Sequence, residues 1–275
     1  MTGSARRRSE DSRYGDQVPL VAAAVCPHPP LLVPEVAGST APELDDLRAA
    51  CDTVVRRLFG AEPDTVLLLG TGPVTGPIRN PATGSLQPWG VDLDVPLVSG
   101  QPDRGAVLPL SLTIGAWLLA RHDPRAPATA TPATPPQVTA PPAVAPRVTA
   151  VQVAADAGPA ELAALADEIN AVGDRVALLV LGDGSACRGE KAPGYDDPRA
   201  RPYDQRVATA LAEADLDGLL DLDPVLSAEL KAAGRAPWQV LASAARSAGG
   251  GWRGELLHDS APYGVAYFVA SWERV

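Results

Sequence analysis

Residues 21–38 read VAAAVCPHPPLLVPEVAG, and this stretch decides how the chain is folded. The apolar run from Val18 to Val25 has the length of a β-strand, and prolines then surround His28. Each proline fixes its own φ and biases the preceding residue towards an extended backbone, so no helix can form there. We therefore expect His28 on a stiff loop at the carboxyl end of a buried strand, where open α/β sheets bind ligands. A histidine held there suits a metal ligand or a general base; the alternative is a structural histidine in a proline-rich strand exit.

The composition describes an acidic globular protein. The chain has 275 residues, of which 46% are hydrophobic, enough to bury a substantial core in one large or two small domains. Its net charge is −10 and no basic face is evident, which argues against sequence-independent binding to nucleic acid or to an anionic membrane. Of the 23 basic residues only Lys191 and Lys231 are lysine, a usage typical of a GC-rich genome such as that of an actinobacterium.

The cysteines and the N-terminal region favour a cytoplasmic location. The three cysteines form no C-x-x-C pair, and an odd number does not suit a disulfide framework; they are Cys26, Cys51 and Cys187. Three arginines at 6–8 followed by VPLVAAAVC faintly resemble a lipoprotein signal, but acidic residues lie between them and the apolar run is very short. No stretch approaches the roughly 20 apolar residues of a membrane helix. We expect reduced thiols in a cytoplasmic protein.

The chain is expected to form a single domain over residues 18–275. Residues 1–17 are polar and charged, which is typical of a disordered tail. Residues 123–147 consist almost entirely of Ala, Pro, Thr and Val and are interpreted as a disordered insertion in that domain. Each side of the insertion alone has too few strands for a stable sheet, so we do not expect it to separate two domains.

The first half of the domain predicts a strand–helix–strand unit. Thr40 is a candidate N-cap with Glu43 completing a capping box, and the helix is expected to run to about Phe59. The apolar run 66–69 then predicts a strand covered on both faces, parallel to the first strand because such crossovers join parallel strands.

The rest of the chain predicts further helices, strands and a hairpin. Helices are expected at 109–120, 159–172, 202–214, 223–233 and 236–247, strands at 148–153 and 176–181, and one extended piece at 90–98. The runs 252–258 and 265–271 are joined by a short turn and predict a C-terminal β-hairpin at the sheet edge. These elements predict an α/β fold with a central, mostly parallel, mixed sheet.

Four strand exits could share one rim and so form a site: the His28 loop, Thr71-Gly72, Asp183-Gly184-Ser185, and the turn from His258 to Tyr263. The glycine-rich pieces lack the spacing of a dinucleotide fingerprint or a phosphate-binding loop. A Ser-His-Asp hydrolase would need Ser185, Asp183, and either His28 or His258.

Two further residues are weighed against simpler roles. Cys187 is a candidate nucleophile, but a loop thiol is the more ordinary interpretation. His122 borders the insertion and is expected to be a solvated residue at a helix end.

Taken in order, five motifs resemble the class III extradiol ring-cleavage dioxygenases of the subunit-B type, a superfamily that includes the Memo-like proteins. The motifs are PHPPLLVPE, VLLLGTGP, LGDGSA, APGYDDPRARPYD and APYGVAYFVA, and the resemblance covers roughly Val18 to Trp272. It implies a three-layer α/β/α sandwich. It also implies Fe(II) bound by two histidines and a glutamate, with a further histidine as acid/base. Two imidazoles and one carboxylate on one face leave open positions for substrate and oxygen.

The match to the functional positions of that family is incomplete. His28 stands where the first histidine ligand is expected, but the second falls on Gly72 and the acid/base histidine on Ala186. The carboxylate falls near Ser260 or Ala261, neither of which binds iron. A rearranged metal site would need His28 and His258 with one of three carboxylates; the candidates are Glu35, Asp183 and Asp259, and Cys26 could also reach the rim.

Three functions follow as hypotheses. The first is a non-catalytic protein that has lost most of its Fe(II) site and binds a small molecule or a protein partner. Its cleft would be lined by His28, Glu35, Thr71, Gly72, Asp183, Ser185, Arg188 and Tyr263. The second is an active metal-dependent oxidoreductase with a rearranged ligand set, and the third a metal-independent hydrolase. A homo-oligomer is compatible with all three.

Overall fold

The computed structural model describes residues 20–98, 105–122, 145–173 and 175–275. The predicted tail 1–17 and most of the predicted insertion 123–147 lie outside these residues. Arg147 was predicted to belong to the insertion but is the first residue of a strand, because it pairs with Thr65 in the sheet. Within the described residues no helix is long and apolar enough to cross a membrane.

A seven-stranded sheet forms the centre of the molecule, in the order β3-β7-β2-β8-β1-β10-β9. Its strands are β1 Leu20–Cys26, β2 Thr65–Gly72, β3 Gly76–Pro77, β7 Arg147–Ala154, β8 Val176–Leu181, β9 Trp252–Ser260 and β10 Tyr267–Arg274. The strands β7, β2, β8 and β1 are parallel to one another. β3 pairs antiparallel with β7 at one end of the sheet, and at the other end β10 pairs antiparallel with β1 and with β9. β1 and β2 are parallel as predicted, but β8 lies between them.

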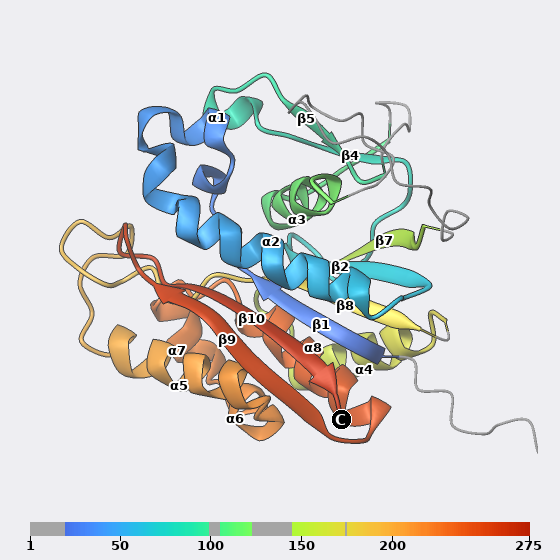
Figure 1. Ribbon diagram of the computed structural model, residues 1–275. Coiled ribbons are helices and arrows are strands. Elements are labelled where there is room, and N and C mark those ends of the chain that lie inside the picture. Colours follow the sequence, from blue (N-terminus) through green and yellow to red (C-terminus); the bar gives the residue numbers. More distant parts are fainter. Residues whose placement is uncertain (1–19, 99–104, 123–144, 174) are drawn as a thin grey trace, which may run out of the picture.

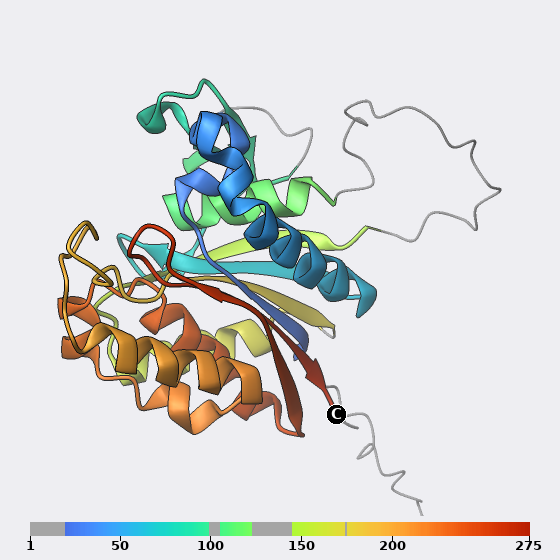
Figure 2. The same ribbon diagram turned by 60° about the vertical axis from the view of Figure 1, so that its left-hand side comes forward.

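The central strands are apolar on both faces because helices cover both faces. Every residue of β8 is buried, and its side chains alternate between two hydrophobic cores: Leu178 and Val180 belong to one, Leu179 and Leu181 to the other. This arrangement confirms the predicted α/β fold with three layers, in which a mixed sheet separates two helical layers (Figures 1 and 2).

The helices divide between the two faces of the sheet. α2 Asp45–Gly60 and α3 Leu110–Ala120 cover one face, with the small sheet β5-β4-β6 on the same side (Figure 1). The other face is covered by α4 Pro159–Asn170, α5 Ala200–Glu213, α6 Leu216–Leu220, α7 Pro224–Glu229 and α8 Arg235–Ala248. The short elements are η1 Pro30–Leu32, α1 Pro34–Ala37, η2 Gly38–Leu44, η3 Gln87–Trp89, β4 Ala82–Ser85, β5 Asp94–Pro96 and β6 Ala106–Val107.

The predicted start of the second helix is wrong. α2 begins at Asp45, and Thr40 lies in η2, where its hydroxyl donates to the carbonyl of Ala37 instead of capping a helix. Glu43 does not complete a capping box, because its carboxylate accepts a hydrogen bond from the phenol of Tyr263. A contact with a residue 220 positions away therefore replaces a local one. Asp45 and Asp46 in the first turn of α2 supply the negative charge that favours a helix N-terminus.

The predicted C-terminal hairpin is confirmed, with β9 at the edge of the sheet and β10 against β1. α5 packs on β9 at Gly254, where a Cβ atom would lie 2.6 Å from the carbonyl oxygen of Leu211. The indole of Trp272 donates to the same carbonyl at 2.8 Å. The hairpin is thus held against α5 by a contact that only glycine permits.

Replacing Gly254 by alanine should lower the free energy of unfolding by about 1–3 kcal/mol, because the added methyl group meets backbone atoms that cannot move aside cheaply. Urea denaturation measures the difference. Gly60→Ala is the matched control, since no atom of the residues that the structure describes lies within 4 Å of its Cβ position at the end of α2. Equal stability of the two variants would contradict the close packing of α5 on the hairpin.

Candidate functional site

His28 lies in the loop that joins β1 to η1, as the prolines around it predict. The strand ends at Cys26, and η1 begins at Pro30. The histidine is 8% exposed, so the loop holds it against the protein instead of in solvent. Figure 1 shows that the carboxyl end of β1 and the β9–β10 turn lie at the same end of the sheet's strands.

His28 is in direct contact with Asp183, the second residue after β8. The backbone N–H of His28 donates to Asp183 Oδ1 at 2.8 Å, and the ring Nδ1 lies 3.6 Å from the same oxygen. Nδ1 is buried and has no hydrogen-bond partner among the described residues. Burial raises the pKa of the Asp183 carboxyl, and His28 opposes that rise. β1 and β8 are neighbours in the sheet, so their exits bring an imidazole and a carboxylate together.

Two tyrosines of the hairpin follow from this pair outward: Tyr267 lies near Asp183, and Tyr263 lies near Tyr267. Tyr267 is 3% exposed; burial raises the pKa of its phenol, and the charges of Asp183 and Tyr263 add to that rise. Tyr263 donates to Glu43 Oε2 at 2.9 Å, which ties the hairpin turn to η2. The phenols are therefore neutral hydrogen-bonding groups near neutral pH.

The segment Gly182–Cys187, here called the β8 exit segment, is joined to three parts of the chain. Ser185 and Gly184 exchange backbone hydrogen bonds with Ala266 at the start of β10. The N–H of Ala186 donates to Leu230. The N–H of Gly234 donates to Asp183, and the two chains approach so closely that a Cβ on Gly182 would lie 2.6 Å from Gly234 Cα. Asp183 is thus placed by backbone contacts from both sides.

Ser185 is a buried structural residue. It is fully buried, its hydroxyl donates to Asp204 Oδ2 at 2.6 Å, and its N–H donates to Asp204 Oδ1 at 2.8 Å. Burial raises the pKa of Asp204, while the two bonds from Ser185 oppose this; Arg188 Nη1 lies 3.8 Å away. Within the described residues Ser185 has no hydrogen bond to a histidine, an arrangement that does not favour the hydrolase hypothesis.

Sequence reasoning missed Asp204, although a signal was present. Asp204 falls among the apolar positions of α5, next to Tyr203 and one turn before Val207 and Ala208, all of which are buried. A charged residue on the buried face of a helix normally has a partner in the core. The partner could not be named, because Ser185 lies 19 residues away in a different element.

The other positions matched to the dioxygenases are filled by ordinary packing. A Cβ on Gly72 would lie 2.2 Å from Gln152 Oε1, so a larger residue could not enter without moving that side chain. Ala186 is buried. Ser260 Oγ lies 2.7 Å from His258 Nε2, a hydrogen bond within β9.

Among the candidate metal ligands, the described residues show direct contact only between His28 and Asp183. Glu35 is exposed on α1, and His258 is engaged with Ser260; burial lowers the pKa of His258, while Asp259 and Asp46 oppose this. No group of three or more His, Cys, Asp or Glu side chains in the described ranges could hold a metal ion. The contact between His28 and Asp183 supplies one imidazole and one carboxylate, and the second imidazole of the ligand set implied by the dioxygenase resemblance is not beside them among the described residues.

The three cysteines are buried, and His122 is held by a contact with an aspartate. All three cysteines are free and buried. Burial raises the pKa of the Cys187 thiol, whose single S–H is shared between the carbonyls of Gly194 and Leu230, an environment typical of a structural cysteine. The prediction of a solvated His122 is wrong, because its Nε2 lies 3.0 Å from Asp52 Oδ1 and its side chain is only 15% exposed.

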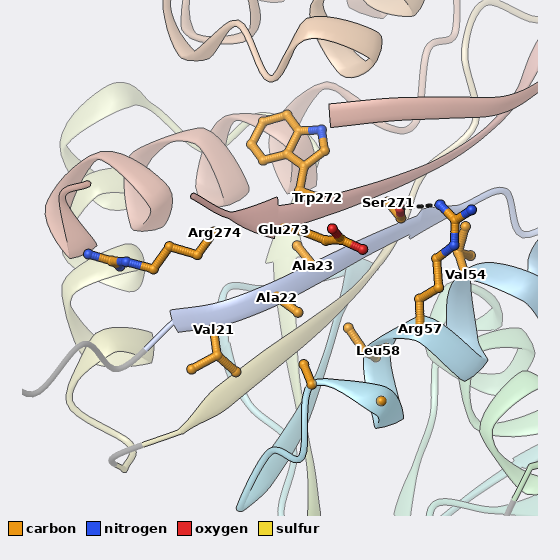
Figure 3. A pocket seen from close by; sticks show the side chains of 12 residues that line it. Val21, Ala22, Ala23, Val54, Arg57, Leu58, Ser271, Trp272, Glu273 and Arg274 are labelled. Carbon is orange, nitrogen blue, oxygen red and sulfur yellow. Dashed lines mark hydrogen bonds between the residues drawn. The ribbon is translucent and has the colours of Figure 1, made fainter. Parts of the chain in front are cut away.

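A separate cavity of about 410 Å³ lies along β1 away from the His28 loop (Figure 3). It is lined by residues 21–23 of β1, by the end of α2, and by residues 271–274 of β10. Arg57 lines it and is already paired: Nη1 donates to Glu255 Oε2 at 2.6 Å and to Ser271 Oγ at 3.0 Å. The charge of this arginine is thus neutralised within the protein.

No protein-family model matches the chain, and no curated protein matches it significantly. A solved structure with a similar chain course is the crystal structure of an uncharacterized protein, JW3007, from Escherichia coli K12. The match covers 92% of this chain and 99% of that one, with 14% sequence identity and a TM-score of 0.49. A likeness at this level carries no argument about function.

Removing the Asp204 carboxylate should destabilise the protein. Asp204→Ala leaves two buried donors of Ser185 without an acceptor, and each such group costs about 1–3 kcal/mol, so we expect a loss of about 2–6 kcal/mol in urea denaturation. Asp221→Ala is the control, because Asp221 is an exposed partner of Arg206 and such pairs contribute about 0–1 kcal/mol. Similar losses in both variants would show that Asp204 does not hold the β8 exit segment.

The stability of Asp183→Asn relative to wild type should increase with pH. The pKa of Asp183 is raised in the folded state. The free energy of unfolding of the wild type therefore falls as the pH rises from the pKa of an unfolded aspartate, about 3.9, through the pKa of the folded state. Asparagine keeps an oxygen for the His28 N–H but cannot ionise. Urea denaturation from pH 4 to 8 measures the difference, with exposed Asp92→Asn as the control, for which a pH-independent difference is expected. A flat difference for Asp183→Asn would refute the burial of a charged carboxylate.

Proposed function

We propose that this chain is a non-catalytic small-molecule-binding protein built on an extradiol-dioxygenase-like scaffold, with its ligand held at His28 and Asp183. The observation that carries the proposal is the buried Nδ1 of His28, which has no partner among the described residues. A buried polar atom without a partner costs free energy, so an added hydrogen-bonding ligand atom would be favoured there.

The surroundings of His28 support binding better than turnover. Asp183 accepts a hydrogen bond from the backbone N–H of His28, and this bond positions the imidazole. Asp183 is a carboxylate, so it does not replace the second histidine of the dioxygenase ligand set. The positions matched to the other histidines are Gly72, packed against Gln152, and the buried Ala186. A scaffold with one imidazole, one carboxylate and neutral phenols nearby can recognise a polar molecule by hydrogen bonds.

The resemblance to dioxygenases supplies the ligand class for the first experiment. A phenolic molecule is the first ligand to test, because its hydroxyl can form a hydrogen bond with an imidazole nitrogen such as Nδ1 of His28. An active oxidoreductase with a rearranged ligand set remains the second candidate, because His28 and Asp183 are two of the ligand types used by non-haem iron sites.

The proposal is tested by calorimetric titration of metal-free protein with 4-nitrocatechol. We expect His28→Ala to weaken binding at least tenfold, because a lost hydrogen bond to a charged or strongly polar partner is worth about 1.5–3 kcal/mol. His122→Ala is the matched control: that histidine also pairs with an aspartate, Asp52, but at the end of α3, and its loss should leave affinity unchanged.

Two results would decide against the proposal. Equal binding by wild type and His28→Ala would place the ligand elsewhere. One equivalent of tightly bound iron in anaerobically purified protein, lost in His28→Ala but retained in His122→Ala, would favour the oxidoreductase instead.

A further inference from the structure

A cavity of about 640 Å³ lies between α7, the start of α8 and the loop that follows β7. Its volume falls in the range of small-molecule sites, roughly 300–1,000 Å³. Residues 231–233 form part of its wall, and the same loop contacts the β8 exit segment through Gly234 and Asp183. Thr71 at the end of β2 donates to the carbonyl of Ala233. The cavity thus lies beside the carboxyl ends of the parallel strands but is not lined by His28.

Arg235 lines this cavity as a buried cation. It is 4% exposed, and its Nη1 donates to the carbonyl of Ala157 at 3.1 Å and to Gln239 Oε1 at 2.9 Å, while Nη2 donates to the carbonyl of Ala155. The Gln239 amide is itself held by the carbonyls of Leu220 and Leu222, which directs its oxygen to Arg235. The guanidinium is therefore fixed in place by neutral acceptors.

No carboxylate oxygen of the described residues lies within 4 Å of Arg235. A buried charge is usually paired, because its desolvation is expensive, and burial lowers the pKa of this guanidinium. Arg57 in the cavity of Figure 3 shows the contrasting case, since its guanidinium binds the carboxylate of Glu255. Arg235 instead presents a fixed cation whose counter-charge the described chain does not supply by direct contact.

The other charged residues of the lining favour an anion over a cation. Glu229 is bound to Arg199 at 2.6 Å, so its charge is compensated. Lys231 donates to the carbonyl of Pro193, which leaves its positive charge beside the cavity. Asp156, an exposed residue of the lining, acts on Arg235 through its charge without direct contact. Among the described residues, the lining therefore holds one carboxylate outside an ion pair, Asp156, against the two cations Arg235 and Lys231.

Most of the remaining lining is apolar, and its one hydroxyl, that of Ser227, is engaged with the Tyr203 phenol and the Asp223 carbonyl. The apolar part is formed by small aliphatic and ring side chains of α7 and the following loop: Pro224, Val225, Ala228, Ala232 and Ala233. Val225 is 65% exposed, a large apolar side chain left in contact with solvent. Such a wall suits an apolar body of a ligand, and the cation at its edge suits one negative group.

We propose that this cavity binds a small organic carboxylate with an apolar body, its carboxylate on Arg235 and its body against α7. The site goes beyond the function proposed for His28 and does not depend on it. The ligand class is any small molecule that combines a single carboxylate with a hydrocarbon or aromatic group. The planar guanidinium of arginine is the side chain that best matches a carboxylate.

The test uses 4-phenylbutanoate and its uncharged analogue 4-phenylbutanamide in calorimetric titrations of the full chain. The carboxylate should bind wild type at least tenfold more tightly than the amide. Arg235→Gln should remove this preference, and Ala228→Trp should weaken binding of both compounds at least tenfold by filling the cavity. Ala228 is exposed on α7, so this variant is not expected to disturb folding, and it decides the matter if Arg235→Gln does not fold.

Three controls separate this site from others. Ala164→Trp places the same side chain at an exposed position of α4, and Arg57→Gln removes one of the two arginines that line the other cavity; both variants should bind as wild type. His28→Ala should also bind as wild type, so failure of the function proposed for His28 is distinguishable. Equal affinity of wild type for carboxylate and amide, or unchanged binding by Ala228→Trp, would overturn the proposal.

Discussion

The carboxylate of Asp204 holds the β8 exit segment, and the candidate site depends on that hold. The N–H and the hydroxyl of the fully buried Ser185 both donate to the carboxylate of Asp204. These two hydrogen bonds fix the segment in the core. Burying the charge is costly, as the raised pKa of Asp204 shows, and the hydrogen bonds from Ser185 offset part of that cost. Asp183 lies two residues before Ser185, so its position beside His28 follows from the same anchoring.

The loop at 230–234 connects the two regions in which we propose binding. On one side it donates to Asp183 through Gly234 and accepts from Ala186 through Leu230. On the other side its residues 231–233 form part of the wall of the cavity that Arg235 also lines. A ligand in that cavity would therefore touch residues one to three positions from Gly234, which donates to Asp183. The fold provides a short physical path between the proposed anion-binding cavity and the imidazole–carboxylate pair.

Predictions from sequence succeeded where the chemistry is local or periodic, and failed where a distant residue provides the partner. The prolines around His28 and the apolar run of β8 act through their own backbone and burial, so their structures followed directly. The capping box at Thr40 failed because Glu43 binds Tyr263 instead. Ser185 was a candidate nucleophile in the sequence, but a nucleophilic serine and a buried structural serine differ in the side chain that their hydroxyl contacts. In this protein that side chain is Asp204.

By itself the sequence determined an α/β sheet with buried parallel strands, a hairpin at its edge, and a histidine on a stiff strand exit, because strand periodicity and proline geometry are properties of neighbouring residues. Only the tertiary structure decided that β8 lies between β1 and β2, that His28 meets Asp183, and that Arg235 is buried with no carboxylate of the described residues in contact. These features depend on strand order and on the side chains that it brings together. Both are set by packing among residues far apart in the chain, and no local pattern encodes that packing.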